Sequence, residues 1–497
     1  MVELERFLVA PDSSIREVMA CIDRNAKGVA LVVDDTHQLL GTVTDGDIRR
    51  AILRDVDLGA PVAQVIHCDP VVGHVGMPRQ SLLHLMTQRE VHQLPILDED
   101  GRVVDLVLLT DLTFIPLCVP EIRGNEWKYI KECLDTNWVS SAGKYVDLFE
   151  QQVAAYVGTR YGVATVNGTA ALHIALKVAG VQPDDEVLVS SLTFIAPVNA
   201  IAYCGAYPVF IDAEPATWNM DPEKVHDFLT RECHYTSGQL VNKRTGRAVR
   251  GILPVDILGH SVDMDPILDL ARQYDLFVVD DATECVGAEY KGRKVGQLGD
   301  IACFSFNGNK IITAGGGGMI VTDNKEWAKR AKQLTTQGRD DALDLEYIHH
   351  EIGYNYRLTN IQAAMGVAQL EQLEEFIKAK RRVAACYTQQ LSEVNGIAPP
   401  REAPWAKSTF WLYTILVDKN QYGSSSREVL GHLSGFGIQA RPLWMPIHRQ
   451  RPYLDCQAYR IEVADRLYDQ AVSLPCSVGI TSEEIDCVVN AIRSTAQ

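Results

Sequence analysis

Apolar positions in the first 113 residues form short runs that predict a small α/β unit. The stretch KGVALVVDD (27–35) holds a continuous apolar run, which is typical of a buried strand. Residues 38–53 then predict a short strand, a turn and an amphipathic helix. A weaker copy of this order follows at 92–112, so the pattern indicates an internal duplication with a repeat of about fifty residues.

The pattern changes near Ile115, where Pro116, Pro120 and Gly124 mark a domain boundary. From there, apolar strands alternate with helical segments over short connections. Expected helices cover 168–180, 193–205 and 263–274, and expected strands cover 185–190, 207–213, 251–257, 276–281 and 301–306. This alternation predicts a mainly parallel sheet with helices on both faces.

Residues 357–391 predict one long amphipathic helix, with room for a kink. A strand (410–417), a helix (426–437) and a strand (438–444) follow, which favours a small α+β domain at the C-terminal end. We therefore expect three domains, at 1–113, 116–375 and 376–497.

Composition narrows the class of protein. The chain has 497 residues, of which 46% are hydrophobic and 22% are charged, and its net charge is −17. The Lys and Arg residues are not clustered, so we expect no nucleic-acid partner. The N-terminal residues lack a signal-peptide pattern and no apolar run is long enough to cross a membrane, so we expect a cytoplasmic enzyme. The twelve cysteines are scattered singly, which favours reduced thiols over disulfides or a metal site.

A candidate anion site lies at the start of the helix 168–180. The chain turns there through Asn167-Gly168-Thr169, where Gly168 permits close backbone approach and the Thr169 hydroxyl can donate to a phosphate. The alternative is an ordinary capped helix start.

Three further features follow other strands. Asp280 and Asp281 end the strand 276–281, where an acid can pair with a protonated pyridine nitrogen or simply cap a helix. Lys310 precedes four glycines and can form a Schiff base, whereas a lone lysine is usually a surface charge. Ser305 can hold a phosphate oxygen, and Phe194 can cover a flat ring or belong to the core.

Six motifs occur in order and resemble the DegT/DnrJ sugar aminotransferases, which have the aspartate aminotransferase fold. They are GTAALHIAL, TFIAPVNAI, LGHSVDMDPI, DDATE, FSFNGNKIITAGGGGMIVTD and GYNYRLTNIQAAMGVAQLEQL. The resemblance covers residues 116–497. It implies a fold-type I α/β enzyme with a mainly parallel seven-stranded sheet, and its details are similar to the LegC-like branch.

The resemblance also implies roles for residues. Lys310 resembles the lysine that binds pyridoxal 5′-phosphate, and Asp281 resembles the partner of its ring nitrogen. Phe194 resembles the stacking aromatic, and Gly168, Thr169 and Ser305 resemble the phosphate cradle. Glu284 stands where many relatives have Gln near the ring hydroxyl, and an ionised Glu can only accept hydrogen bonds. Asn355 resembles an asparagine that reaches the neighbouring subunit's cofactor, which implies a homodimer with shared active sites.

The implied reaction is transamination of a UDP- or GDP-linked 4-keto-6-deoxy sugar with L-glutamate, for legionaminic acid or bacillosamine-type glycans. Lys144, Arg441 and His448 are candidates for binding the diphosphate, and each is otherwise a surface residue. Two alternatives stay open: a pyridoxal phosphate enzyme acting on a non-nucleotide sugar or cyclitol, and an inactive nucleotide-sensing regulator.

The segment GTVTDGDIRR resembles a CBS motif, so the N-terminal unit is expected to be a CBS domain pair. In that family the residues at Thr44 and Asp47 contact the ribose of an adenine nucleotide, and both side chains suit a diol. The corresponding position in the second half is Leu108, so at most one competent site is expected. The alternative is a dimerisation or docking module without a ligand.

Overall fold

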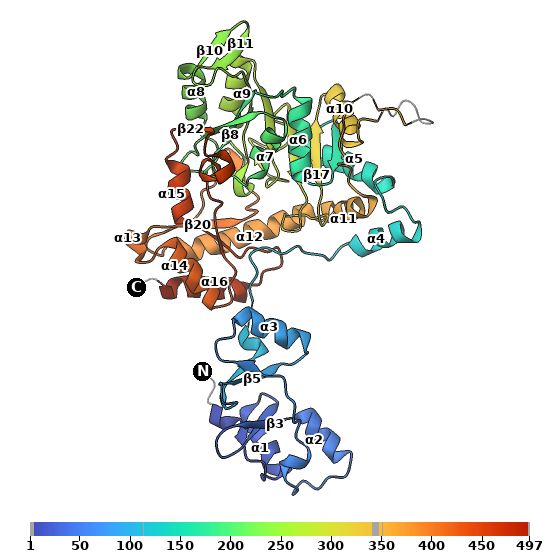
Figure 1. The fold of residues 1–497 in the computed structure, drawn as a ribbon, viewed down its shortest axis with the longest axis vertical. Coiled ribbons are helices and arrows are strands. Elements are labelled where there is room, and N and C mark those ends of the chain that lie inside the picture. Colours follow the sequence, from blue (N-terminus) through green and yellow to red (C-terminus); the bar gives the residue numbers. More distant parts are fainter. Residues whose placement is uncertain (1–3, 113, 340–346, 350, 496–497) are drawn as a thin grey trace. The chain divides into compact units, whose positions relative to one another are not determined.

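The computed structural model describes residues 4–112, 114–339, 347–349 and 351–495. The chain divides into two compact units, Met1–Ile115 and Pro116–Gln497 (Figure 1). The predicted domain limits at 1, 113 and 497 lie outside the described residues. In the described part, no helix is both long and apolar enough to span a bilayer.

The N-terminal unit contains the same three-stranded motif twice, which confirms the predicted duplication. In each copy the first strand is parallel to the second, which is antiparallel to the third. The register of the antiparallel pair shifts at the same point in both copies, at Val32/Val33 and at Ile96/Leu97. The elements are η1 (Leu4–Arg6), β1 (Leu8–Val9), α1 (Ile15–Asn25), β2 (Val29–Val33), β3 (Leu39–Thr44), α2 (Asp45–Ile52), η2 (Val62–Gln64), β4 (Gly73–His74), α3 (Arg79–Gln88), β5 (Gln93–Leu97), β6 (Val103–Leu108) and η3 (Leu109–Leu112).

The larger unit is built on an eight-stranded sheet in which only one strand runs against the others. The strands, in spatial order, are β22 (Gln457–Tyr459), β9 (Tyr207–Ile211), β8 (Glu186–Ser190), β12 (Val249–Leu253), β13 (Phe277–Asp281), β16 (Ile301–Ser305), β17 (Gly318–Thr322) and β7 (Tyr161–Thr165). The antiparallel strand is β17. Seven strands match the expected sheet, and β22 adds an eighth because a three-residue segment near the C-terminus pairs with β9. Three residues are too few to show a periodic pattern in the sequence.

Helices cover both faces of this sheet, as predicted. One face packs against α6 (Gly168–Val178), α7 (Ala196–Tyr203) and α10 (Lys325–Thr335). The other packs against α8 (Pro222–Arg231) and α9 (Met264–Tyr274). Alternate residues of β13 enter the two layers, Val279 the first and Val278 the second. The pleat of β13 therefore also sends its two terminal acids to opposite faces.

The predicted long helix is two consecutive helices, α11 (Asn360–Leu370) and α12 (Leu373–Leu391), which continue one another in Figure 1. The domain limit expected at 375/376 falls inside α12. Helices α4 (Glu126–Asp135) and α5 (Lys144–Val157) pack against α11.

A four-stranded antiparallel sheet forms the C-terminal part of this unit. Its strands, in spatial order, are β18 (Ile397–Ala398), β20 (Tyr413–Val417), β23 (Ala471–Leu474) and β21 (Arg441–Pro442). The remaining elements are β10 (Cys233–Thr236), β11 (Gln239–Asn242), η4 (Ile257–Gly259), β14 (Glu289–Tyr290), β15 (Arg293–Lys294), β19 (Ala406–Lys407), α13 (Lys419–Tyr422), α14 (Ser426–Gly435), η5 (Ile447–Arg449), η6 (Arg451–Tyr453), α15 (Val463–Gln470) and α16 (Ser482–Thr495).

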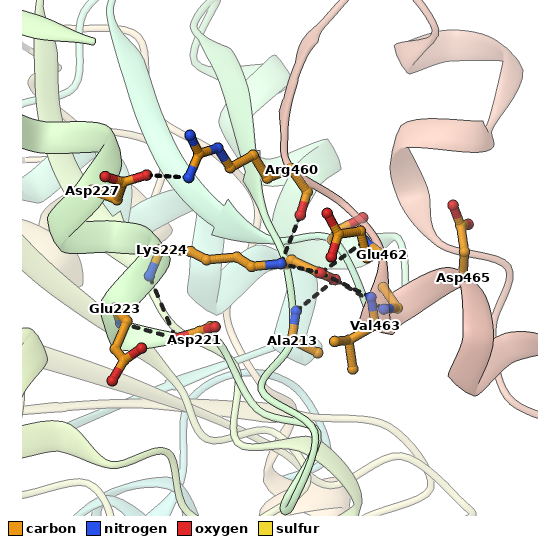
Figure 2. A network of polar contacts seen from close by, with 12 residues as sticks. Ala213, Asp221, Glu223, Lys224, Asp227, Arg460, Glu462, Val463 and Asp465 are labelled. Carbon is orange, nitrogen blue, oxygen red and sulfur yellow. Dashed lines mark hydrogen bonds and ion pairs between the residues drawn. The ribbon is translucent and has the colours of Figure 1, made fainter. Parts of the chain in front are cut away.

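A buried carboxylate joins this C-terminal part to the main sheet. Asp212 directly follows β9 and is fully buried. It accepts hydrogen bonds from the N–H groups of Glu462, Val463 and Ala464 at the start of α15, over 2.8, 2.9 and 2.9 Å. Lys224 Nζ lies 2.6 Å from Asp212 Oδ2, and Figure 2 shows this network. The carboxylate thus caps a helix that begins 250 residues later in the chain.

Candidate active site

A cavity of about 430 Å³ opens beyond the carboxyl ends of β13 and β16, beside the N-terminus of α6. This is where ligands bind in open α/β sheets. Eight residues singled out from the sequence line it: Gly168, Thr169, Phe194, Asp281, Glu284, Ser305, Lys310 and Arg441. These residues come from six separate stretches of sequence, and the fold brings them to one place.

The start of α6 forms a narrow cradle against β16. Asn167 caps the helix, because its Oδ1 accepts from the N–H of Ala170 over 2.8 Å. A Cβ atom on Gly168 would lie 2.9 Å from the Cβ of Ser305 and 3.2 Å from Cγ2 of Thr283, so only glycine fits. The first N–H groups of a helix have no partner within the helix, and with the hydroxyls of Thr169 and Ser305 they suit a phosphate.

Asp281 faces the cavity, on the face of the sheet that carries α6. Its Oδ1 accepts from the N–H of Thr283 over 3.2 Å. The residue is almost fully buried, and burial raises the pKa of this carboxyl. A cationic ring nitrogen placed here would restore the missing counter-charge.

Asp280 points to the opposite face, where it meets Asp256 at the end of β12. Both carboxyl groups are fully buried and lie close to one another, so the repulsion between their charges favours a proton on one of them. Burial, followed by the nearby charge of Asp281, raises the pKa of Asp280 to about 7. Within the described residues, neither oxygen of Asp280 has a hydrogen-bond partner.

Lys310 lies in the tight turn after β16. Its N–H donates to the carbonyl of Asn307 over 3.0 Å. Its Nζ lies 3.8 Å from Glu284 Oε1 and 3.8 Å from the centre of the Trp411 ring. Burial lowers the pKa of Lys310, against the opposing attraction of Glu284 and Asp281, which brings the amine closer to the neutral form needed for proton transfer.

The backbone conformation explains the four glycines that follow Lys310. Gly315 and Gly317 have φ angles of 74° and 123°, which favour glycine. A Cβ atom on Gly318 would lie 2.5 Å from the carbonyl oxygen of Asn167. The glycine run therefore lets β17 approach the phosphate cradle.

Glu284 lies deep in the cavity wall. Its Oε2 accepts from the N–H of Leu258 over 2.7 Å, and Leu258 has a φ of 58°. Such a conformation costs about 1–3 kcal/mol in a non-glycine residue, so the backbone is held there by its surroundings. Burial raises the pKa of Glu284 to about 7, although Lys310 acts in the opposite direction. Glu284 can therefore be protonated near neutral pH and donate a hydrogen bond, as the glutamine of many relatives would.

Aromatic side chains border the cavity. Phe194 is 52% exposed, so its ring is available to a ligand rather than buried in the core. Trp411 and Trp444 also line the cavity, with nearly parallel rings 6.3 Å apart. Neither tryptophan was expected at the site from the sequence. Both lie at the ends of predicted strands, where a local pattern does not distinguish them from core residues.

Three predicted residues lie outside the cavity. Lys144 is 63% exposed and forms an ion pair with Glu132. His448 Nδ1 lies 2.8 Å from the hydroxyl of Ser191. Asn355 is exposed and forms an isolated bridge with Thr336. Arg441, in contrast, lines the cavity, and no residue in the described part of the chain forms an ion pair with it.

In the N-terminal unit, Thr44 and Asp47 form a capping box at the start of α2. The hydroxyl and N–H of Thr44 donate to Asp47 Oδ2 over 2.7 and 2.9 Å, and Arg50 lies 2.6 Å from Oδ1. Both residues therefore have a structural role in this copy of the motif.

Comparison with known proteins agrees with this geometry. Residues 120–493 match the DegT/DnrJ/EryC1/StrS aminotransferase family, and residues 5–54 and 62–116 match the CBS domain. The chain belongs to the DegT/DnrJ/EryC1/StrS aminotransferase family. It carries a pair of CBS domains in its N-terminal unit.

The aminotransferase is similar to proteins named GDP-perosamine synthase. The one from Caulobacter vibrioides is 40% identical over 385 residues, which are 77% of this chain and 99% of the relative. The one from Escherichia coli O157:H7 is 36% identical over 382 residues, 77% and 98% of the two chains. A crystal structure of DesI with its TDP-sugar product is 28% identical, covers 75% of this chain and 90% of DesI, and superposes with a TM-score of 0.67.

Pyridoxal 5′-phosphate is the cofactor of this aminotransferase family, and the cavity fits it. The close approach of Gly168 to Ser305 leaves room for a phosphate at the start of α6. Asp281 is a buried acid without a cation directly bound to it, and Lys310 is a buried amine in the same cavity. A phosphate, a ring nitrogen and an aldehyde would each meet a suitable group.

Proposed function

We propose that this aminotransferase transfers an amino group from L-glutamate to the 4-keto group of a nucleotide-linked 4-keto-6-deoxy sugar. The observation that carries the proposal is the single cavity that holds Lys310, Asp281, Glu284 and the helix-start cradle. An inactive regulator would have no reason to keep these groups together in one buried place.

Pyridoxal 5′-phosphate, when bound, supplies an aldehyde that holds the amino group and a ring that withdraws electrons. Lys310 would bind this aldehyde and, once released by the amino donor, move a proton at its Nζ between substrate and cofactor carbon atoms. Asp281 would keep the ring nitrogen protonated. Gly168, Thr169 and Ser305 would hold the phosphate, Phe194 would cover the ring, and Glu284 would approach its hydroxyl.

Arg441 is the best placed of the three candidates for the sugar nucleotide. It lines the cavity from β21, and it is free of ion pairs with the described residues, so its guanidinium can bind a diphosphate. Lys144 and His448 lie outside this cavity. We therefore propose that Arg441 binds the diphosphate. Lys144 and His448 could contribute only if the site is shared between subunits.

The similarity to proteins named GDP-perosamine synthase supports a GDP-linked substrate over a UDP-linked one. The LegC-like resemblance leads us to expect a product for glycans of the legionaminic acid or bacillosamine type. The substrate for such a product is UDP- or GDP-linked, and the experiment must distinguish these two alternatives.

The deciding experiment incubates the purified enzyme with 15N-labelled L-glutamate and a panel of GDP- and UDP-linked 4-keto-6-deoxy sugars. We expect mass spectrometry to find 15N on the sugar, with a GDP-linked member giving the highest kcat/KM. Nitrogen transfer only to a non-nucleotide sugar or cyclitol would favour the alternative enzyme. No transfer to any member would contradict the substrate class.

The shared site is a proposal that rests on Asn355, which is exposed and outside its own subunit's cavity. We expect the enzyme to be a homodimer in which Asn355 reaches the other subunit's cofactor. Mixed dimers of Lys310→Ala and Asn355→Ala chains should then regain one intact site each. Mixed dimers that stay as inactive as the single variants would contradict a shared site.

The N-terminal unit is proposed to bind an adenine nucleotide at Thr44 and Asp47, with docking or dimerisation as the alternative. A ribose would have to compete with the local bonds between Thr44, Asp47 and Arg50. Calorimetric titration with AMP and ATP tests this, with Asp47→Asn as the control variant. Equal heats for the wild type and the variant would contradict the assignment.

A further inference from the structure

Two cysteines lie side by side next to the cavity without a role in the transamination. Cys118 follows Leu117, which lines the cavity, and Cys476 lies just after β23. The N–H of Cys476 donates to the Leu117 carbonyl over 2.8 Å, and the N–H of Val119 donates to the Ser477 hydroxyl over 3.0 Å. The two segments therefore run side by side, which brings Cys118 and Cys476 next to one another.

A buried lysine lies against this pair. Lys380 projects from α12 and is only 2% exposed. Its Nζ donates to the carbonyl oxygen of Trp411 over 2.7 Å and lies 3.3 Å from Cys476 Sγ. Among the described residues, no carboxylate forms an ion pair with Lys380. Because an unpaired buried charge is strongly destabilising, a thiolate at Cys476 would balance this ammonium.

The surroundings of Cys476 favour its thiolate form. The neighbouring Cys118 thiol and the Lys380 ammonium lower the pKa of Cys476, although burial opposes them. The neighbouring Cys476, together with burial, raises the pKa of Cys118 and favours its thiol form. A thiolate beside a thiol is the arrangement that reacts with peroxides and then closes a disulfide.

We propose that Cys118 and Cys476 form an oxidation site, at which a peroxide converts the thiol–thiolate pair into an intramolecular disulfide. The Cys476 thiolate attacks one oxygen of hydrogen peroxide, forms a sulfenic acid and releases hydroxide as the O–O bond breaks. The thiol of Cys118 then displaces the oxygen as water and forms the S–S bond. Two electrons leave the sulfur atoms and reduce one peroxide to water and hydroxide. Cys118 is partly exposed, so a molecule as small as peroxide can approach from its side.

The site is coupled to Lys310 through shared partners. The carbonyl oxygen of Asn309 accepts from Cys118 Sγ over 3.4 Å and from the indole N–H of Trp411 over 2.7 Å. The Trp411 ring contacts Lys310 Nζ. A disulfide would remove the anion from Lys380 and the thiol from Asn309, so oxidation should lower the transaminase activity reversibly. Only this consequence for activity rests on the proposed function; the disulfide does not.

The test treats the full-length holoenzyme with hydrogen peroxide, alkylates the free thiols, and maps peptides without reduction. We expect one cross-linked pair of peptides containing Cys118 and Cys476, lighter by two hydrogens and reversed by dithiothreitol. Cys118→Ser and Cys476→Ser should each abolish the cross-link, and Cys476→Ser, which removes the sulfur that peroxide attacks, should protect the remaining activity from peroxide. Cys68→Ser, which removes an exposed thiol in the N-terminal unit, should leave both responses unchanged.

Three results would overturn the proposal or part of it. Sulfinic or sulfonic acid on Cys476 without a cross-link would exclude the pairing. Unmodified Cys118 and Cys476 in a sample whose Cys68 is oxidised would exclude the oxidation site. A complete cross-link with unchanged activity would exclude the coupling to Lys310.

A second measurement tests the thiolate itself. The rate at which Cys476 reacts with iodoacetamide, followed against pH by mass spectrometry, should be half-maximal below about pH 7 in the wild type. Lys380→Met should lower the rate at pH 6 by at least about tenfold, because one unit of pKa changes the thiolate fraction tenfold. If Lys380→Met does not fold, the wild-type profile decides alone, and a midpoint at or above about pH 8.5 would overturn the proposal.

Discussion

Asp212 and Asp281 are both buried acids at the ends of central strands, but the protein satisfies them differently. Asp212 receives three N–H groups from α15 and the ammonium of Lys224. Burial raises the pKa of Asp212, but the bonds from Lys224 and α15 lower it by a larger amount, so the net result is a lowered pKa. Asp281 has a single N–H donor at 3.2 Å, and burial raises its pKa. A buried acid with all its partners stabilises the fold, whereas one that lacks a partner is reserved for a ligand.

The same difference separates their surroundings. Lys224 lies 2.6 Å from the structural acid Asp212, while Lys310 lies 3.8 Å from Glu284 and contacts the Trp411 ring. Asp280 and Asp256, behind the cavity, are buried and form no ion pair with a cation among the described residues. The site region therefore contains more buried carboxyl groups than cationic side chains. This excess of acid favours the binding of a cationic cofactor ring.

The largest expected effect tests the two lysines. Lys310→Ala should lower kcat by at least about 10³-fold, because it removes the group that transfers the proton, and should leave the melting temperature of the folded enzyme close to that of the wild type. Lys224→Met is the matched control: it should keep kcat within a small factor and lower the melting temperature. Steady-state kinetics and calorimetry measure both. A large loss of kcat in Lys224→Met would contradict the contrast.

The next effect concerns the acids themselves. Asp212→Asn should lower the free energy of unfolding by about 3 kcal/mol, since it leaves Lys224 and the start of α15 without their acceptor. Asp280→Asn should change it much less, because neither side-chain oxygen of Asp280 has a hydrogen bond to lose among the described residues. Urea denaturation compares the two variants. Equal losses would show that Asp280 is as firmly held as Asp212.

The sequence predicted those site residues that belong to a local sequence motif. Lys310, Asp281 and Gly168 each follow or precede a strand with an obvious turn, and their motifs are local. Asp256 and Trp411 escaped notice because they reach the site through packing between segments that are far apart in the chain. β22 was missed for the same reason, since its pairing with β9 spans about 250 residues. Asp47 was expected to bind a ligand, and the structure adds the capping box that its local sequence also allows.

A smaller effect is the dependence of stability on pH. In the cofactor-free protein, burial raises the pKa of Glu284 to about 7, so the folded state binds more protons than the unfolded state between its ordinary value of 4.5 and about 7. Stability from this group is therefore complete below the lower value and is lost as the pH rises, by at most about 3 kcal/mol in total. Asp212, whose pKa is lowered, acts with the opposite sign and loses its contribution only in acid.

Glu284→Gln is the variant that isolates this effect. Urea denaturation of the cofactor-free protein at pH 5 and pH 8 should show a smaller fall in stability with rising pH in the variant than in the wild type. Addition of pyridoxal phosphate should raise the stability of both. The same slope in both proteins would assign the pH dependence to Asp280, whose pKa is also raised to about 7.

The smallest effect extends the contrast to Asp47 in the N-terminal unit. Like Asp212, this acid already has its partners, namely the hydroxyl and N–H of Thr44 and the guanidinium of Arg50. Thr44→Ala should therefore lower the stability of this unit by about 1 kcal/mol, the usual cost of losing an N-terminal cap, and leave the transamination rate unchanged. If Thr44→Ala instead leaves the stability unchanged and abolishes nucleotide binding, then Asp47 is, like Asp281, an acid that serves to bind a ligand.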